Sequence, residues 1–261
     1  MMRLSVAHRS ECGGREANED AVGFCANETQ GCFVLADGTG GHEGGALASG
    51  TVVKEVLTYF SATPKIDGDS SGTLLSVARE ALFEVRKLNQ QFPEMNTTIA
   101  TLVMDTERGI AYWNSLGDSR IYLFRSGRAH CLTTDHSILQ SMIDAGFFTG
   151  ELRGNCRRNM LYAAVGSEEL PERAIQDEPF LLQTGDIFLL CTDGLWENIS
   201  EDIMEEMLRQ AKTPEQWIDD MMDEVPEPYA PELDNFSALA VWVGEREAET
   251  TRILPENHQQ E

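Results

Sequence analysis

An α+β fold, with antiparallel sheets that carry helices on their outer faces, is predicted by three features of the sequence. Short apolar runs recur along the chain, and several are joined by tight Gly or Asp-Gly turns. Two long helical patterns follow the first three runs, and two shorter patterns precede the last run. We find no internal repeat or low-complexity linker, so we expect a single domain over 1–244 and a polar, mobile tail over 245–261.

Nine runs have the length and the apolar content of strands, which is too many for a helical protein. They cover 4–8, 21–26, 32–37, 97–105, 110–118, 120–127, 130–135, 186–194 and 237–244. Apolar side chains at helical spacing predict an antiparallel pair of helices over 45–60 and 73–88. A shorter helix over 136–146 ends on Gly146, which is a typical C-cap residue, and two more are expected over 201–210 and 214–225.

Composition narrows the function classes. The 261 residues include 44 acidic and 20 basic side chains, which gives a net charge of -24. This charge disfavours nucleic acid and anionic membranes as partners. The sequence has no apolar run of about 20 residues and no signal-peptide core, so we expect a cytoplasmic protein. Six cysteines occur without a C-x-x-C pair, and buried reduced thiols are the preferred interpretation over disulfides.

The stretch "FVLADGTGGHEGG" at 33–45 carries an apolar strand into Asp37 and then into a series of glycines. A dinucleotide cradle would need glycine where Glu43 stands, and no P-loop pattern follows, so the glycines do not indicate a nucleotide phosphate site. Other acids also occupy predicted strand ends, where a sheet can bring distant segments together. They are Asp20, Asp118, Asp193 and Asp234.

Grouped carboxylates repel one another unless cations or protons compensate their charge. Mg²⁺ and Mn²⁺ prefer oxygen ligands and also accept a peptide carbonyl such as that of Gly38. A zinc site is poorly supported, because the sequence has no C-x-x-C or H-E-x-x-H motif. Each acid alone is more often a turn or cap residue, and Arg15 alone would be a surface ion-pair residue. Beside a metal cluster, however, the guanidinium of Arg15 is suited to bind phosphate oxygens.

The segments "REANED", "LADGTGGHEGG", "LGDSR", "CTDGLWE" and "DN" occur in the order and approximate spacing of one known family. In these motifs the chain resembles the PPM-type metal-dependent Ser/Thr protein phosphatases, also called the protein phosphatase 2C family, over roughly 5–244. The segment "LTTDHSILQSMIDAG" resembles the short, stand-alone bacterial members. The resemblance implies two central antiparallel sheets packed as a sandwich and flanked on both sides by antiparallel helix pairs.

The resemblance also implies a set of site residues and two Mn²⁺ or Mg²⁺ ions, with a third, weaker ion in bacterial members. Asp37 would bridge the two ions, and the carbonyl of Gly38 would bind one of them. Asp193 and Asp234 would hold the other ion, while Glu19 and Asp20 would act mainly through bound waters. The third ion would lie at Asp118 together with Asp193, and Arg15 would bind the substrate phosphate.

The implied reaction is hydrolysis of phosphoserine or phosphothreonine by direct attack of a metal-bridging hydroxide. The implied partners are phosphorylated proteins and a bacterial Ser/Thr kinase that this enzyme opposes, and a monomer is expected. Two other functions stay open on the sequence: a catalytically weak member that binds phosphoproteins as a regulator, and a hydrolase of small phosphoesters. The retained acids argue against the first.

Three parts of the sequence depart from the family pattern. Position 39 is Thr, where eukaryotic relatives carry a His that protonates the leaving group, and His42 is interpreted as a cap or exposed residue. Position 197 is Glu, where the family often has Asp, which bears on the third ion. The flap segment at 149–166 is the least family-like. Its basic residues are interpreted either as local ion-pair partners or as a docking patch for phosphorylated peptide: Arg153, Arg157 and Arg158.

Overall fold

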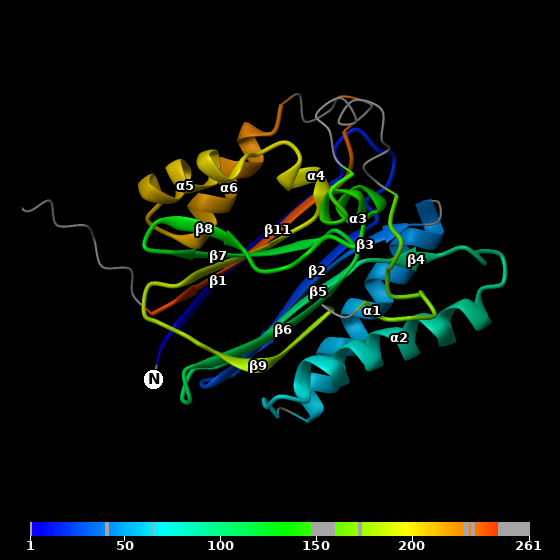
Figure 1. Ribbon diagram of the computed structural model, residues 1–261, viewed down its shortest axis with the longest axis horizontal. Helices are drawn as coiled ribbons and strands as arrows, with labels where there is room; N and C mark the ends of the chain where they lie inside the picture. The colour runs from blue at the N-terminus through cyan, green and yellow to red at the C-terminus, as the bar shows by residue number, and fades with distance from the viewer. Residues whose placement is uncertain are drawn as a thin grey trace, which may run out of the picture.

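The computed structural model describes residues 2–39, 42–63, 65–147, 160–171, 174–226, 230 and 233–244. Within these ranges two antiparallel sheets pack face to face, and helices cover both outer faces (Figure 1). The predicted α+β class and its sandwich of sheets are therefore confirmed. Among the described helices, none combines the length and apolar character that a bilayer crossing requires.

One sheet has the strand order β1-β11-β10-β7-β8, and the other has the order β2-β3-β5-β6-β9, with β4 paired to β3. The strands of the first sheet are β1 (Leu4–Glu11), β7 (Arg120–Arg125), β8 (Arg128–Cys131), β10 (Ile187–Cys191) and β11 (Phe236–Val243). Those of the second are β2 (Asp20–Ala26), β3 (Gln30–Thr39), β4 (Asn96–Thr97), β5 (Ile99–Asp105), β6 (Ile110–Leu116) and β9 (Ile175–Leu181).

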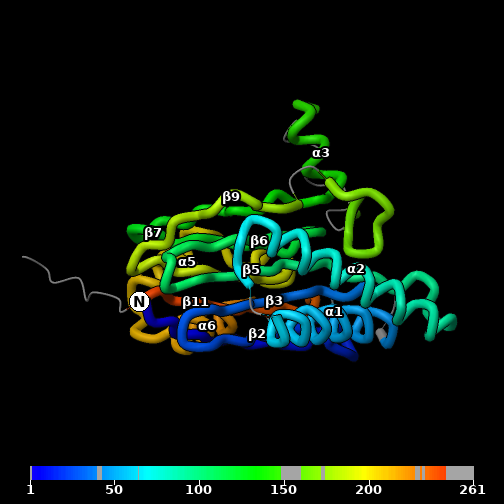
Figure 2. Tube along the Cα trace, turned by 90° about the horizontal axis from the view of Figure 1, so that it is seen from below, coloured from blue at the N-terminus to red at the C-terminus, as the bar shows by residue number. Residues whose placement is uncertain are grey.

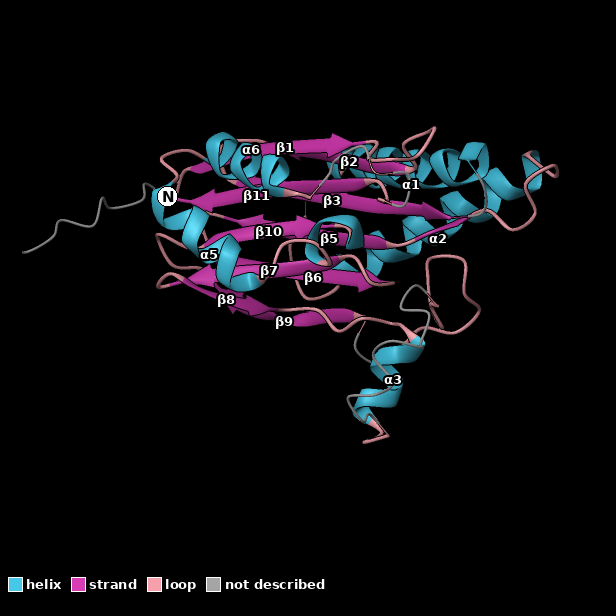
Figure 3. Cartoon of the chain, turned by 90° about the horizontal axis from the view of Figure 1, so that it is seen from above, coloured by secondary structure: helices cyan, strands magenta, loops and turns pink. Residues whose placement is uncertain are grey.

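The helices are α1 (His42–Ala62), α2 (Ser70–Leu88), α3 (Ile138–Asp144), α4 (Asp193–Trp196), α5 (Glu201–Gln210) and α6 (Pro214–Glu224). The pair α1 and α2 covers the sheet that contains β3, and α5 and α6 cover the other sheet (Figures 1 and 3). Helix α3 projects away from the sandwich (Figures 2 and 3). The two predicted long helices are confirmed, although each begins three residues earlier than predicted and the first ends two residues later.

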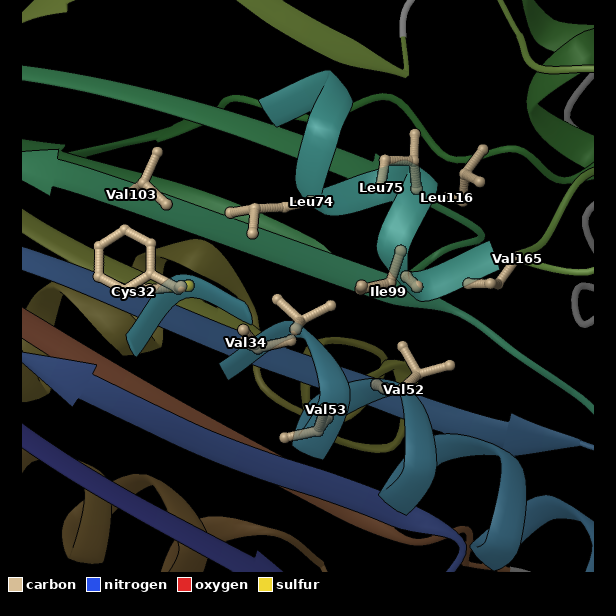
Figure 4. Packing of buried hydrophobic residues seen from close by; sticks show 14 of the residues in the cluster. Cys32, Val34, Val52, Val53, Leu74, Leu75, Ile99, Val103, Leu116 and Val165 are labelled. Carbon is tan, nitrogen blue, oxygen red and sulfur yellow. The ribbon is translucent and has the colours of Figure 1, made fainter. Parts of the chain in front are cut away.

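Alternating side chains of the central strands supply two cores at once, because successive residues of a strand point to opposite faces. In β3, Phe33 and Leu35 join the core between the sheets, while Cys32 and Val34 face α1 and α2 (Figure 4). These central strands therefore read as continuous apolar runs in the sequence. The five described cysteines are free thiols, but only Cys32 and Cys191 are buried as predicted, and Cys131 is exposed.

Strand β9 was not predicted, because its sequence IQDEPFL carries two acids and Pro179. β9 lies at the edge of its sheet. Proline is tolerated there because the outer edge of the strand has no partner strand and needs no backbone N–H donor. The pairing of β6 with β9 also contains an irregularity between Ala111 and Trp113. The short elements β4 and α4 were not predicted either, since two to four residues carry too little pattern.

Candidate functional site

Three carboxylates converge at one end of the sandwich. Asp37 comes from β3, Asp118 from the turn between β6 and β7, and Asp193 from the first position of α4. Each offers one oxygen atom, and these atoms all lie within 4.8 Å of one another. Strand ends from both sheets therefore bring together acids that are far apart in the sequence.

Asp20 joins this group from β2, where it is paired with Asp37 in the antiparallel register. Its Oδ2 accepts hydrogen bonds from the hydroxyls of Thr192 (2.9 Å) and Ser237 (2.6 Å). Its Oδ1 is buried without a hydrogen-bond partner, and the same holds for Oδ1 of Asp193. Buried polar atoms are normally satisfied, so these two oxygens mark positions suited to a cation.

The pKa values of the grouped acids support this interpretation. Burial, reinforced by the neighbouring carboxylates, holds the pKa of Asp37 and of Asp193 well above the usual range. Burial also raises the pKa of Asp20 to about 7 and that of Asp118 to about 6. Divalent cations would oppose these shifts by stabilising the ionised carboxylates, and an all-oxygen ligand set is the one that Mg²⁺ and Mn²⁺ prefer. The residues present therefore fit a divalent metal centre.

Asp234 lies at the border of the cluster, and its charge raises the pKa of Asp20, Asp37 and Asp193. Its Oδ2 accepts a hydrogen bond from Nη2 of Arg15 at 2.9 Å, and its Oδ1 accepts from the backbone N–H of Asn235. The guanidinium predicted to bind phosphate is thus already next to the predicted metal ligands. It is also exposed enough to reach a substrate, with 45% of its side-chain surface accessible.

The glycines after Asp37 are explained by close backbone packing. The backbone N–H of Gly38 donates to the carbonyl of Glu19 at 3.0 Å, and a Cβ at Gly38 would overlap the carbonyl oxygen of Gly45. A Cβ at Gly45 would in turn overlap the carboxylate of Glu19. The start of α1 can therefore lie against the end of β3 only if both positions lack side chains. The carboxylate of Glu19 lies in this contact.

Short polar side chains fix the backbone of Asp37. The hydroxyl of Thr98 accepts from the N–H of Asp37 at 2.9 Å and shares a 2.7 Å hydrogen bond with Ser119. The hydroxyl of Thr97 donates to the carbonyl of Asp37 at 2.9 Å. These residues were not predicted from the sequence. The features that could have indicated them are the pair of threonines directly before an apolar strand and the serine inside "LGDSR".

Arg120, the last residue of "LGDSR", helps to hold Asp118 in place through Trp196. Its guanidinium forms a two-point ion pair with Asp135, with N–O distances of 2.9 and 2.7 Å, and lies 3.5 Å from the ring centre of Trp196. The indole Nε1 of Trp196 donates to the carbonyl of Asp118 at 3.0 Å. Trp196 packs against the core, and it also orients a predicted site residue.

The remaining predicted residues divide into two groups. Thr39 and Glu197 are described and exposed; the charge of Glu197 raises the pKa of Asp118 and of Asp193. The flap arginines, the side chain of His42 and the tail at 245–261 lie outside the described residues. The flap arginines are Arg153, Arg157 and Arg158.

Comparisons with known proteins identify the family of the chain. The sequence profile of the family described as Protein phosphatase 2C matches residues 9–236. The serine/threonine phosphatase stp of Listeria monocytogenes is 32% identical over 209 residues, which are 76% of this chain and 80% of that protein. The serine/threonine protein phosphatase PstP of Mycobacterium tuberculosis is 30% identical over 212 residues, which are 79% of this chain and 39% of that protein.

Solved structures that superpose on this chain are also serine/threonine phosphatases. The S. agalactiae serine/threonine phosphatase superposes with a TM-score of 0.80 at 26% identity, covering 93% of this chain and 99% of that one. The catalytic domain of PstP in complex with 2 manganese ions superposes with a TM-score of 0.77 at 26% identity, covering 94% of this chain and 100% of that one. The chain therefore belongs to the protein phosphatase 2C family and is a protein serine/threonine phosphatase.

Proposed function

We propose that this protein removes phosphate from phosphoserine and phosphothreonine in a reaction that depends on two Mn²⁺ or Mg²⁺ ions. One observation carries the proposal: Asp37, Asp118 and Asp193 each place one oxygen within 4.8 Å of the others, and Asp118 and Asp193 are buried while Asp37 is half-buried. Such a group is unfavourable unless cations or protons neutralise it, and divalent ions with oxygen ligands do so while keeping the carboxylates ionised. The structure with 2 manganese ions among the similar proteins supports the same cofactor class.

The ligands follow from the site geometry and from the family resemblance. We assign Asp37 and the carbonyl of Gly38 to the two main ions, together with Asp193 and Asp234. Asp20 and Glu19 would act through ordered waters, and Asp118 with Asp193 would hold a third, weaker ion. When bound, the ions supply an activated water molecule and positive charge for the phosphate oxygens.

The side chains of the protein supply the remaining parts of the reaction. Arg15 leaves Asp234 and binds two phosphate oxygens with its planar guanidinium. Thr97 and Thr98 hold the backbone of Asp37 from both sides, so the carboxylate is oriented before substrate arrives. Water attacks phosphorus, the bond from phosphorus to the serine or threonine oxygen breaks, and the leaving oxygen takes a proton from solvent. Thr39 is not an acid at neutral pH and does not supply that proton.

We infer that phosphorylated proteins are the substrates and that a Ser/Thr kinase produces them, because the similar bacterial proteins are named serine/threonine phosphatases. The catalytic domain spans 1–244 in this proposal, and the enzyme works as a cytoplasmic monomer. The flap arginines Arg157 and Arg158 are assigned to substrate docking.

The test compares a phosphothreonine peptide with an aryl phosphate, each with Mn²⁺ and with a chelator. We expect hydrolysis of both substrates with Mn²⁺, a higher kcat/KM for the peptide, and no hydrolysis in the chelator. Turnover of the aryl phosphate alone would instead identify a small-phosphoester hydrolase. Peptide binding without turnover would identify a phosphoprotein-binding regulator.

A further inference from the structure

A second cluster of positive charge lies outside the carboxylate site, on helix α2. A pocket of about 370 Å³ opens between α2 and the segment at 165–167, and two arginines, Arg79 and Arg86, line it. The other lining residues include one acid, Glu80, and the aromatic ring of Phe83, which is 58% exposed. In a chain with a net charge of -24, two arginines facing one pocket need an explanation.

These two guanidiniums differ in their partners from several other arginines of the protein. Arg120, Arg125 and Arg128 each form an ion pair with a carboxylate. Arg79 instead donates to the backbone carbonyls of Ser167 and Glu168, at 2.6 and 3.1 Å.

Arg86 donates from Nε to the carbonyl of Met95 at 2.7 Å. Among the described residues, neither Arg79 nor Arg86 forms an ion pair with a carboxylate. Burial lowers the pKa of Arg86, and the charge of Glu94 acts in the opposite direction from beyond ion-pair distance. Each guanidinium therefore keeps N–H donors and positive charge available for an incoming anion.

The local backbone is built around Arg86. A Cβ at Gly166 would overlap its guanidinium, so the side chain lies directly against this peptide. The N–H of Gly166 donates to the side chain of Asn96 in β4, and Asn96 pairs with Thr39 at the end of β3. The pocket is thus joined through β4 to the strand end that carries Asp37.

This connection limits the distance to the carboxylate site. The step from Gly166 to Asn96 and the step from Asn96 to Thr39 are each close to the spacing between neighbouring strands. Together they place Gly166 on the order of 10 Å from Thr39. An extended peptide rises about 3.3 Å per residue. With the phosphorylated residue at the carboxylate site, the pocket would therefore contact peptide residues roughly three to six positions away from it.

We propose that the pocket between α2 and 165–167 binds anionic side chains of the polypeptide substrate, several residues away from the phosphorylated residue. The ligand chemistry is a carboxylate or a second phosphate group. This inference rests on the proposed function, because it assigns a substrate preference to the same enzyme.

A polypeptide fits this pocket better than free phosphate does. Arg79 and Arg86 are seven residues apart on α2, so their backbones are separated by about 10 Å along the helix. Alternate side chains of an extended peptide are about 7 Å apart and can therefore reach both guanidiniums. The exposed ring of Phe83 adds an apolar surface for the peptide, which inorganic phosphate would not use.

The test uses the full chain with Mn²⁺ and three substrates: a phosphothreonine peptide with Asp residues three to six positions away, its Asn counterpart, and an aryl phosphate. The double variant Arg79→Gln, Arg86→Gln removes both charges. We expect KM for the Asp peptide to rise about tenfold, with little change for the other two substrates, because two charge-assisted contacts are lost. Lys54→Gln on α1 is the matched control, since its side chain is 76% exposed and does not line the pocket.

A second variant tests the proposal if the double variant does not fold. Ser76 is an exposed lining residue, so Ser76→Glu adds an acid to the pocket without removing a packed side chain, and it should also raise KM for the Asp peptide. An unchanged KM for the Asp peptide in folded variants overturns the proposal. So does a wild-type enzyme that does not distinguish the Asp and Asn peptides.

Two further measurements separate this inference from its rivals. If inorganic phosphate inhibits the wild type more strongly than the double variant while the peptide flank has no effect, the pocket takes free phosphate, and the polypeptide assignment is wrong. Fluorescence anisotropy with the unphosphorylated Asp peptide tests binding without turnover. Binding that the double variant loses supports the pocket even if the wild type hydrolyses no phosphopeptide, a result that would refute only the proposed function.

Discussion

Arg15 and Asp234 form an ion pair at the border of the carboxylate cluster, with Nη2 of the arginine 2.9 Å from Oδ2 of the aspartate. The pair joins the residue assigned to phosphate binding with one assigned to metal binding. The loop that carries Arg15 is also tied to this region, because the N–H of Gly14 donates to the carbonyl of Leu233 at 3.0 Å. Metal binding by Asp234 would therefore weaken its hold on Arg15 at the site where the phosphate arrives.

Replacing Arg15 should impair substrate binding more than metal binding. We expect Arg15→Gln to lower kcat/KM for a phosphopeptide by roughly a hundredfold, because two charge-assisted contacts to phosphate are lost. Arg15→Lys should recover only part of this loss, since an ammonium group cannot bind two oxygens in the same plane. Steady-state kinetics and Mn²⁺ titration would measure both effects, with Arg9→Gln in a surface ion pair as control. Normal kcat/KM in Arg15→Gln would contradict the assignment.

Asn235 should be required to hold the Arg15 loop in place. This buried side chain accepts from the N–H of Glu19 at 2.8 Å and donates to the carbonyls of Cys12 and Ala17 at 2.8 and 3.0 Å. Asn235→Ala leaves these groups without their partners, which should cost about 2 kcal/mol or more of unfolding free energy. Denaturant unfolding would measure this cost, and Asn89→Ala at the exposed end of α2 should change it far less. A cost within 0.5 kcal/mol, about that of an ordinary surface change, would exclude the role.

The long elements of the fold and the acids of the site were predictable from the sequence, for physical reasons. Strands such as β3 and β10 are buried on both faces and appear as continuous apolar runs, and the helices that cover them show apolar residues at regular spacing. The acids stood out because apolar runs led directly to Asp37 and Asp193.

The edge strand β9 and the supporting polar residues were not predictable in this way. An edge strand needs no apolar face on both sides, so its pattern is weak. Thr98, Asn235 and Arg120 act through contacts with residues outside their own elements, and their residue types are also common on ordinary protein surfaces. The partners of such side chains exist only once the chain has folded.

Asp193→Asn should abolish Mn²⁺-dependent hydrolysis and leave the fold intact. The variant removes a charged ligand from the three-carboxylate cluster but keeps the size of the side chain. We expect kcat to fall by at least about a hundredfold, as for the loss of a group that positions the reacting charges. Aryl phosphate assays and circular dichroism would check activity and fold, and Asp177→Asn on the exposed face of β9 is the matched control. Turnover close to wild type would refute the proposed metal centre.

The metal-free protein should lose stability as pH rises from about 4 to 7, because Asp20 has a pKa of about 7 in the folded state against an ordinary value of 3.8. In this window the folded chain keeps a proton that the unfolded chain has released, so rising pH favours unfolding. Asp20→Asn removes this contribution, and the midpoint of thermal unfolding in chelator at pH 7.5 should rise by about 2–4 °C for each kcal/mol gained.

With Mn²⁺ added, the stability difference between Asp20→Asn and wild type should shrink or reverse, because bound cations favour the ionised carboxylate. Scans of metal-free protein at pH 5 and pH 7.5 would test the sign directly. Asp177→Asn again serves as the control, since its side chain is exposed on β9 and lies outside the carboxylate cluster. An Asp20→Asn variant that is less stable than wild type at pH 7.5 in chelator would show that the proposed linkage is wrong.

Arg120→Lys should weaken the site although it keeps the charge. The guanidinium binds Asp135 at two points and stacks on Trp196, whose indole orients the carbonyl of Asp118. Lysine cannot reproduce the planar two-point contact or the stacking, so we expect a loss of about 1–3 kcal/mol in unfolding free energy. Because Asp118 is assigned to the weakest ion, the variant should also need more Mn²⁺ for full activity. Denaturant unfolding and Mn²⁺ activation curves would measure the two effects, and an unchanged activation curve in a destabilised variant would limit Arg120 to a structural role.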